Sequence, residues 1–305
     1  MKLLIAFFLF LQCPVQAIDS EKNFVIMIPS YNNKDRYEKN LDSVFSQTAQ
    51  NFRVIYIDDA SPDGTGALVK EYIRKRGLQN RITLIRNEKR VGALANVYRA
   101  VWLCFPHEIV VDLDGDDLFA HENVLAHLNK VYENPSVWLT YGNYICYPSN
   151  EIGGGKEIPR HIIEQNNFRL FAGGTTPTRT FYAGLFHQIK KEDLLYEGEF
   201  FKVASDLAFM FPLLEIAGEH SKFLPEIDYI YNNETPLNDH HLNSTEQRVI
   251  DAYLRSKDKY LPLQQLPGTG SHKKVYISPG AWGQLFAFDS PIFNRDGGLS
   301  AMMIV

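Results

Sequence analysis

The first part of the chain alternates between short apolar runs and amphipathic segments. Four apolar runs end in polar turns and predict buried strands, at 24–32, 52–66, 81–87 and 108–113. Four segments with apolar residues at helical spacing predict helices between them, at 36–47, 67–76, 92–104 and 121–134. Because strands and helices alternate with connections long enough for crossovers, we predict an α/β fold with a mostly parallel central sheet flanked by helices.

The second part of the chain has a weaker pattern. A further strand is predicted at 136–146, followed by three loops rich in Gly, Pro and Asn at 153–160, 172–180 and 231–244. A helix is predicted at 205–218 with Ser205 as a candidate N-cap. Another is predicted at 245–257, and its inward stripe would hold Val249, Ile250 and Tyr253. From Pro262 onward the sequence has no periodicity that predicts an element.

Polar clusters follow the predicted strands, where ligands bind in sheets of this kind. The densest is DLDGDD, which places four aspartates in the six positions 112–117. It fails as a Ca²⁺ loop because Asp117 and Asn123 stand where that loop needs Gly and Glu. Two explanations stay open: a solvated acidic loop, and a divalent cation shared with a diphosphate. For the second, Gly115 would remove a side chain that could crowd the ligand.

Composition and charge narrow the class of protein. The chain has 305 residues, 45% of them hydrophobic, which is ample for a packed core. With 31 basic and 36 acidic side chains the formal net charge is −5, so a nucleic-acid partner is not expected.

The N-terminal residues 1–17 resemble a secretory signal peptide, with a basic start and a short apolar stretch. Removal would leave a chain that begins near Ile18 and has no membrane span. We therefore expect the secretory pathway, either the ER or Golgi lumen or the exterior. The alternative is that these residues form a first strand of a cytoplasmic protein. If residues 1–17 are removed, the remaining cysteines are Cys104 and Cys146, as buried thiols or as one disulfide.

Four segments in this order resemble the nucleotide-binding half of family 2 glycosyltransferases with the GT-A fold: VIMIPSYNN, VIYIDDASPDGTG, NEKRVGALANVYRAV and VVDLDGDDLF. The resemblance covers roughly 24–120. It implies one GT-A domain at 18–260, with a nucleotide-binding half at about 22–120 and an acceptor half at about 121–260. The tail at 261–305 stays unassigned.

The resemblance also implies a metal site and its cofactor. Asp114 and Asp116 match the two acidic positions of the family's D-x-D motif, and Asp117 matches a third acidic neighbour. These residues would hold Mn²⁺ or Mg²⁺, which carries the diphosphate of a nucleotide sugar. His240 and its neighbour His241 are candidates for a third metal ligand or a diphosphate contact.

Further residues match the family's donor-binding positions, in three groups. The residues under the base and ribose would be Pro29, Tyr31 and Asn32. The acidic pair facing the base would be Asp58 and Asp59. The loop near the diphosphate would contribute Arg90 and Gly92. A carboxylate accepts the N3–H of uracil, so we expect a UDP-sugar as the donor.

The catalytic base implied by the resemblance is Asp206, at the start of the predicted helix 205–218. It would deprotonate an acceptor hydroxyl and give inversion at the anomeric carbon. A helix-capping role for Asp206 is the alternative. The Q-x-x-R-W motif of processive synthases is absent from the sequence, so we expect single additions to a glycan, protein or lipid-linked acceptor. The rival functions are a nucleotidyltransferase and a secreted sugar-binding protein derived from a transferase.

Overall fold

The computed structural model describes residues 21–234 and 244–268, and its centre is an eight-stranded sheet with the order β3-β2-β1-β4-β7-β6-β10-β5. The strands are β1 (Phe24–Ser30), β2 (Phe52–Asp58), β3 (Ile82–Arg86), β4 (Ile109–Asp112), β5 (Leu118–Phe119), β6 (Leu139–Tyr147), β7 (Thr180–Tyr182) and β10 (Ser221–Asn232). A separate hairpin pairs β8 (Leu195–Tyr196) with β9 (Glu199–Phe200).

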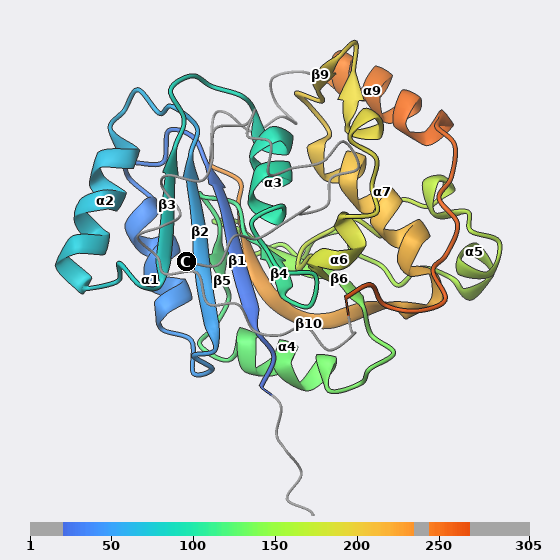
Figure 1. Ribbon diagram of the computed structural model, residues 1–305, viewed down its shortest axis with the longest axis horizontal. Coiled ribbons are helices and arrows are strands. Elements are labelled where there is room, and N and C mark those ends of the chain that lie inside the picture. The colour runs from blue at the N-terminus through green and yellow to red at the C-terminus, as the bar shows by residue number, and fades with distance from the viewer. Residues whose placement is uncertain (1–20, 235–243, 269–305) are drawn as a thin grey trace, which may run out of the picture.

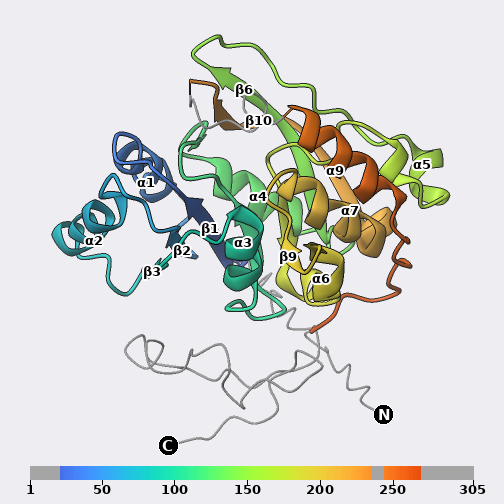
Figure 2. The same ribbon diagram turned by 90° about the horizontal axis from the view of Figure 1, so that it is seen from above.

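Helices cover both faces of the sheet (Figures 1 and 2). They are α1 (Tyr37–Phe45), α2 (Thr65–Arg76), α3 (Ala93–Val101), α4 (Val124–Tyr132), α5 (Arg160–Glu164), α6 (Ala183–Phe186), α7 (Ser205–Ala217) and α9 (Ser244–Ser256). Three short 3-10 turns are η1 (Phe168–Leu170), η2 (Lys191–Leu194) and η3 (Gly218–His220). The alternation predicted from the sequence is therefore confirmed.

Each face of the sheet has its own apolar core, because successive side chains of a strand point to opposite faces. On β1, Val25 and Met27 join a core with α3, α6, α7 and α9. Ile26 and Ile28 join a second core with α1, α2 and α4. All residues of β1 are buried, as expected for a strand covered on both faces.

The sheet is mostly parallel, with two antiparallel insertions. β1 pairs in parallel with both β2 and β4, and β6 pairs in parallel with β10. β7 runs antiparallel between β4 and β6, and β5 runs antiparallel to β10. The second half of the chain therefore completes the same sheet as the first half, as the α/β prediction requires.

Two local predictions for the later helices are wrong. α7 begins at Ser205, but its N-cap is Ala204, which has a left-handed backbone, and no side chain caps the helix. In α9 the predicted Ile250 is buried together with Leu254, whereas the predicted Val249 and Tyr253 are exposed. The apolar stripe of α9 was predicted one position out, because the place where α7 meets α9 decides which face is buried.

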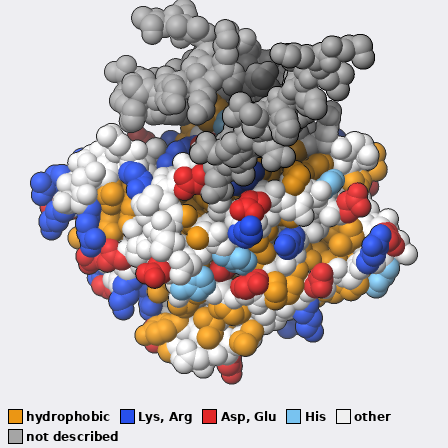
Figure 3. All heavy atoms as spheres, turned by 90° about the horizontal axis from the view of Figure 1, so that it is seen from below, with side chains coloured by type: hydrophobic (Ala, Val, Ile, Leu, Met, Phe, Trp, Pro, Cys, Tyr) orange, Lys and Arg blue, Asp and Glu red, His pale blue; other side chains and the backbone are white. Residues whose placement is uncertain are grey.

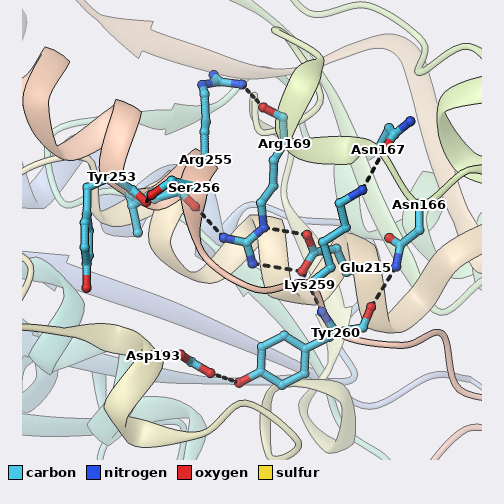
Figure 4. A network of polar contacts seen from close by, with 11 residues as sticks. Asn166, Asn167, Arg169, Asp193, Glu215, Tyr253, Arg255, Ser256, Lys259 and Tyr260 are labelled. Atoms are coloured by element: carbon cyan, nitrogen blue, oxygen red, sulfur yellow. Dashed lines mark hydrogen bonds and ion pairs between the residues drawn. The ribbon is translucent and has the colours of Figure 1, made fainter.

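A buried ion pair fastens the C-terminal segment to the body of the molecule (Figure 4). Arg169 of η1 makes a two-pronged contact with Glu215 of α7, and it also donates to the carbonyl of Leu254 in α9. Glu215 additionally accepts the backbone N–H of Tyr260 at 3.0 Å. The described residues beyond 260 also contact α7, because the N–H of Leu263 donates to the carbonyl of Ile216. The described part of the predicted tail thus packs on α7.

Several predictions concern segments outside the described residues: the signal peptide at 1–17, His240 and His241, and most of the tail at 261–305. Cys104 and Cys146 are both free thiols, with Cys104 buried and Cys146 partly exposed. Within 21–234 and 244–268, none of the helices has the length and apolar character needed to cross a bilayer. On the face in Figure 3 acidic and basic side chains are interspersed.

Candidate functional site

The carboxyl ends of β1, β2 and β4 meet at one edge of the sheet, and the predicted site residues gather there. The N–H of Asp59, just after β2, donates to the carbonyl of Ser30 at the end of β1. The N–H of Gly115, just after β4, donates to the carbonyl of Pro29. These bonds place the aspartate-rich turn and the acidic pair on either side of β1. The sequence predicted that both lie at the carboxyl edge of the sheet.

The turn at 114–117 is held by hydrogen bonds from α1 and from β10. The side-chain amide of Asn40 donates to the carbonyls of Asp114 and Asp117. The carboxylate of Asp117 accepts the hydroxyl of Tyr229 and the backbone N–H of Asn232, both at 2.7 Å. Asp117 is therefore a buried structural residue that joins the turn to β10.

The sequence suggested that glycine at 115 leaves room for a ligand, but in the structure it leaves room for β1 and the residues after it. A Cβ at this position would lie 2.6 Å from Cβ of Ser30 and 2.8 Å from the amide nitrogen of Asn33. These distances are far below van der Waals contact, so any side chain would push the turn away from β1. Gly115 permits the close approach of turn and strand.

Asp114 and Asp116 are half-buried side by side in this turn. Burial, followed by the negative charge of Asp112, raises the pKa of Asp114 to about 8. Enclosed carboxylates that repel one another are the donors that a hard divalent cation neutralises. Within the described residues, no three His, Cys, Asp or Glu side chains are arranged to hold a metal ion. Asp114 and Asp116 are the pair that the sequence predicts for a cation, and that role stays a prediction.

The predicted nucleotide loop lies beside the turn. The guanidinium of Arg90 stacks over the ring of Tyr31, with Cζ 3.9 Å from the ring centroid, so these residues meet although they are far apart in sequence. Asn32 has a left-handed backbone with φ of 59°. Its side-chain Oδ1 is buried and has no hydrogen-bond partner within the described residues. An unsatisfied buried oxygen of this kind is suited to a ligand's donor group.

The acidic pair Asp58 and Asp59 divides into two environments. Both side chains are buried. Asp58 lies 3.7 Å from Nε of Arg86 and accepts the N–H of Ser61. Asp59 accepts the backbone N–H groups of Val91 and Gly92 at 2.9 Å, together with the side-chain amide of Asn87.

The contacts of Asp59 attach the loop that carries Arg90 and Gly92 to the end of β2. Gly92 has φ of 92°, a conformation that favours glycine, and it opens α3. Asp59 is therefore surrounded by protein donors, whereas Asp58 has fewer. Which of the two faces the base stays a prediction.

Asp206 lies in the first turn of α7, and its side chain is 39% exposed. Its Oδ2 is 3.6 Å from Nη2 of Arg179, which precedes β7. The charge of Asp206 is among those that raise the pKa of Asp114, after burial and Asp112. The candidate base and the turn at 114–117 therefore share one electrostatic environment.

Sequence analysis missed Arg179. Its side chain is buried and donates to Oδ2 of Asp112 at 2.7 Å. The available signal was an aspartate, Asp112, inside an otherwise apolar strand, because such a charge requires a partner. Nothing in the sequence placed that partner in a Gly- and Thr-rich loop more than sixty residues later.

Comparison with known proteins identifies the family and the type of fold. The family model described as glycosyl transferase family 2 matches residues 25–191. A UDP-Glc:α-D-GlcNAc-diphosphoundecaprenol β-1,3-glucosyltransferase of Escherichia coli is 28% identical over 137 residues, which cover 45% of this chain and 51% of that protein. A poly(ribitol-phosphate) β-N-acetylglucosaminyltransferase of Staphylococcus aureus is 29% identical over 151 residues, covering 48% and 42%.

The match to curated relatives is partial, since the chain spans about half of their length or less, at 40% to 51% in the first three. Among solved structures, S. aureus TarS residues 1–349 in complex with UDP superposes with a TM-score of 0.53 at 18% identity, covering 69% of this chain and 60% of that chain. A Pyrobaculum calidifontis mannosyltransferase in complex with GDP-Man and Mn²⁺ gives a TM-score of 0.51 at 19% identity, covering 78% and 64%. These likenesses establish the GT-A type of fold.

Proposed function

The chain belongs to glycosyl transferase family 2, whose model matches more than half of it, and we propose that it transfers a sugar from a nucleotide-sugar donor to an acceptor hydroxyl. The observation that carries this proposal is the joining of three groups at one edge of the sheet. These are the turn with Asp114 and Asp116, the stacked pair Tyr31 and Arg90, and the half-exposed Asp206.

We propose a UDP-sugar as the donor. The related E. coli protein is described as using UDP-Glc, and TarS was solved with UDP and with UDP-GlcNAc. Asp58 has a carboxylate at the end of β2, and a carboxylate accepts the N3–H of uracil. We assign Tyr31 and Asn32 to the base and ribose. The stacking of Tyr31 with Arg90 and the unsatisfied Oδ1 of Asn32 support this assignment.

We further propose that Asp114 and Asp116 hold Mn²⁺ or Mg²⁺ when the donor binds. A divalent cation bound there would supply charge neutralisation to the departing diphosphate. This chain supplies the pair of carboxylates. The turn that carries them is fixed by hydrogen bonds from the Asn40 side chain to its backbone carbonyls and by the close packing at Gly115. His240 is retained as a proposed further ligand, although it lies outside the described residues.

Asp206 is the proposed general base for single additions with inversion. The acceptor hydroxyl oxygen forms a bond to the anomeric carbon while the bond from that carbon to the diphosphate breaks. Asp206 takes the hydroxyl proton, and the nucleoside diphosphate leaves with the bonding electrons. Its exposed side chain at the start of α7 is accessible to an acceptor, whether a glycan, a protein or a lipid-linked sugar.

For the location of the protein, we propose that residues 1–17 direct it into the secretory pathway, where an ER or Golgi lumen would provide nucleotide sugars. N-terminal sequencing of the protein made in its own cells tests this proposal. A mature terminus near Ile18 supports it, and an intact Met1 contradicts it.

Donor screening of the purified protein tests the proposed activity. UDP affinity, measured by calorimetry with Mn²⁺, should exceed the affinities for GDP and CDP, and EDTA should abolish it. Hydrolysis or transfer from one UDP-sugar should follow the same metal dependence. Glycan binding without any donor turnover would instead identify a sugar-binding protein, and undiminished UDP affinity in EDTA would remove the metal from the proposal.

A further inference from the structure

Arg179 is a buried cation between two carboxylates that come from different elements. Its Nη1 donates to Oδ2 of Asp112, the last residue of β4, at 2.7 Å. Its Nη2 lies 3.6 Å from Oδ2 of Asp206, the second residue of α7. The guanidinium therefore connects the strand that leads into the metal-binding turn with the helix that carries the proposed base.

The position of Arg179 is held from several directions. Its Nε donates to the carbonyl of Thr175 at 2.7 Å, and its own carbonyl accepts the N–H of Asp112 at 3.0 Å. A guanidinium is planar and rigid, so fixing Nε and Nη1 also fixes the direction of Nη2. That remaining nitrogen points toward Asp206.

The ion pair of Asp112 and Arg179 is costly in this location. Asp112 is 3% exposed and Arg179 is 8% exposed, and β4 is otherwise apolar. Replacing a buried ion pair with apolar residues of similar volume is often neutral or stabilising, so packing alone does not account for it. Arg179 also lies beside Asp206, so a role of the ion pair in the reaction explains its presence better than packing does.

The two carboxylates differ in exposure. Asp112 is buried and its carboxylate contacts Arg179, whereas the side chain of Asp206 is 39% exposed. Asp206 thus has one side against a fixed cation and another side open to an incoming hydroxyl. Burial by itself would lower the pKa of Arg179, but the charges of Asp112 and Asp206 outweigh burial and raise it, so Arg179 stays charged.

We propose that Arg179, anchored by Asp112, is a positioning residue that sets the orientation of the Asp206 carboxylate toward the acceptor. This inference rests on the proposed function, in which Asp206 is the general base. Arg179 itself contacts neither donor nor acceptor. Its effect should therefore appear in turnover and not in donor affinity.

The test removes the anchored pair as a unit, since Arg179→Met alone would leave Asp112 buried without a partner. The variant Asp112→Leu with Arg179→Met keeps the site apolar and filled. Its kcat should fall by about 10- to 100-fold, the cost of displacing a reacting group by roughly an ångström, while its Kd for UDP with Mn²⁺ stays within about threefold.

The matched control removes a second ion pair, which joins β2 to the residue just before β4. Arg53 and Glu108 form a two-pronged contact near the amino ends of β2 and β4, away from the site edge. The variant Arg53→Met with Glu108→Leu should keep the wild-type kcat. An equal loss of kcat in this control would mean that any disturbance of the sheet slows the reaction, and it would overturn the proposal.

A double-mutant cycle distinguishes positioning from a direct role. If Arg179 acts through Asp206, removing the pair in an Asp206→Asn background should change the residual kcat by less than about threefold. A loss as large as in the wild-type background, or a large drop in UDP affinity, would show that Arg179 contacts substrate and would overturn the inference.

Crystal structures of the variants test this inference independently of the proposed function. If no transfer is found, or if Asp206→Asn is fully active, the proposed function fails, yet the position of Asp206 still tests the inference. In the variant that lacks the pair, the Asp206 carboxylate should leave its wild-type orientation. An unchanged orientation would refute the positioning role regardless of activity.

Discussion

At the scale of single residues, the proposed mechanism depends on Asp206 as the general base. Asp206→Asn removes the proton acceptor but keeps the shape of the side chain, so kcat should fall about 10²- to 10⁴-fold while UDP and metal affinities stay close to wild type. Steady-state kinetics with calorimetry of UDP binding measures both, and NMR of the product anomer tests inversion. A fully active variant would leave Asp206 as a residue of the helix end only.

Gly115 lets the turn at 114–117, the proposed metal site, pack closely against β1. Gly115→Ala places a methyl group 2.6 Å from Cβ of Ser30, so it should destabilise the fold by about 1–3 kcal/mol and weaken UDP binding in Mn²⁺. Gly154→Ala is the matched control, because a Cβ there meets nothing within 4 Å. Chemical denaturation and UDP titration of both variants check this; equal behaviour would mean that the turn relaxes freely.

At the scale of elements, α7 joins the candidate base to the C-terminal segment. Its Glu215 is fully buried against Arg169, and breaking a buried ion pair by removing one partner costs about 3–5 kcal/mol. Glu215→Ala should therefore lower the free energy of unfolding by that amount and loosen α9. Glu164→Ala, which breaks the exposed pair with Arg160, should change the free energy of unfolding far less, because solvent screens exposed ion pairs.

Urea denaturation measures both changes, and hydrogen exchange reports on α9. Full protection of α9 in Glu215→Ala would show that its apolar contacts, and not this ion pair, hold the C-terminal segment. In that case the network in Figure 4 would be a consequence of packing.

The elements also show what sequence reasoning reaches and what it does not. Period and turn signals predicted β1 to β4 and the helices between them, because those signals are local. The antiparallel β7 and the burial of Leu254 instead of Val249 depend on long-range packing. The resemblance supplied Asp114 and Asp206, but the pairing of Asp112 with Arg179 and the anchoring of a loop by Asp59 required three-dimensional structure.

At the scale of the whole molecule, stability should depend on pH through His127. Its hydrogen bond to buried Asp228, on β10, raises the pKa of this histidine on α4 despite partial burial. A histidine whose pKa is raised by folding contributes stability that is fully present below its unfolded value near 6.5 and is lost as pH rises through the folded value. The wild type should therefore lose stability across that range.

The comparison with His127→Gln isolates this contribution. The difference in melting temperature between wild type and variant should be largest near pH 6 and shrink on going to pH 9. His161→Gln, at an exposed position, should show no such trend. A pH-independent difference for His127→Gln would mean that its contact with Asp228 does not depend on protonation.

The position of β10 has a consequence for synthesis of the protein. β10 lies inside the sheet, between β6 and β5, and its residues Tyr229 and Asn232 hold Asp117 in the metal-binding turn. A nascent chain that has emerged only to residue 191 contains the whole segment matched by the family model but lacks this strand. Under the proposed function, donor binding should therefore begin only after residue 232 has left the ribosome.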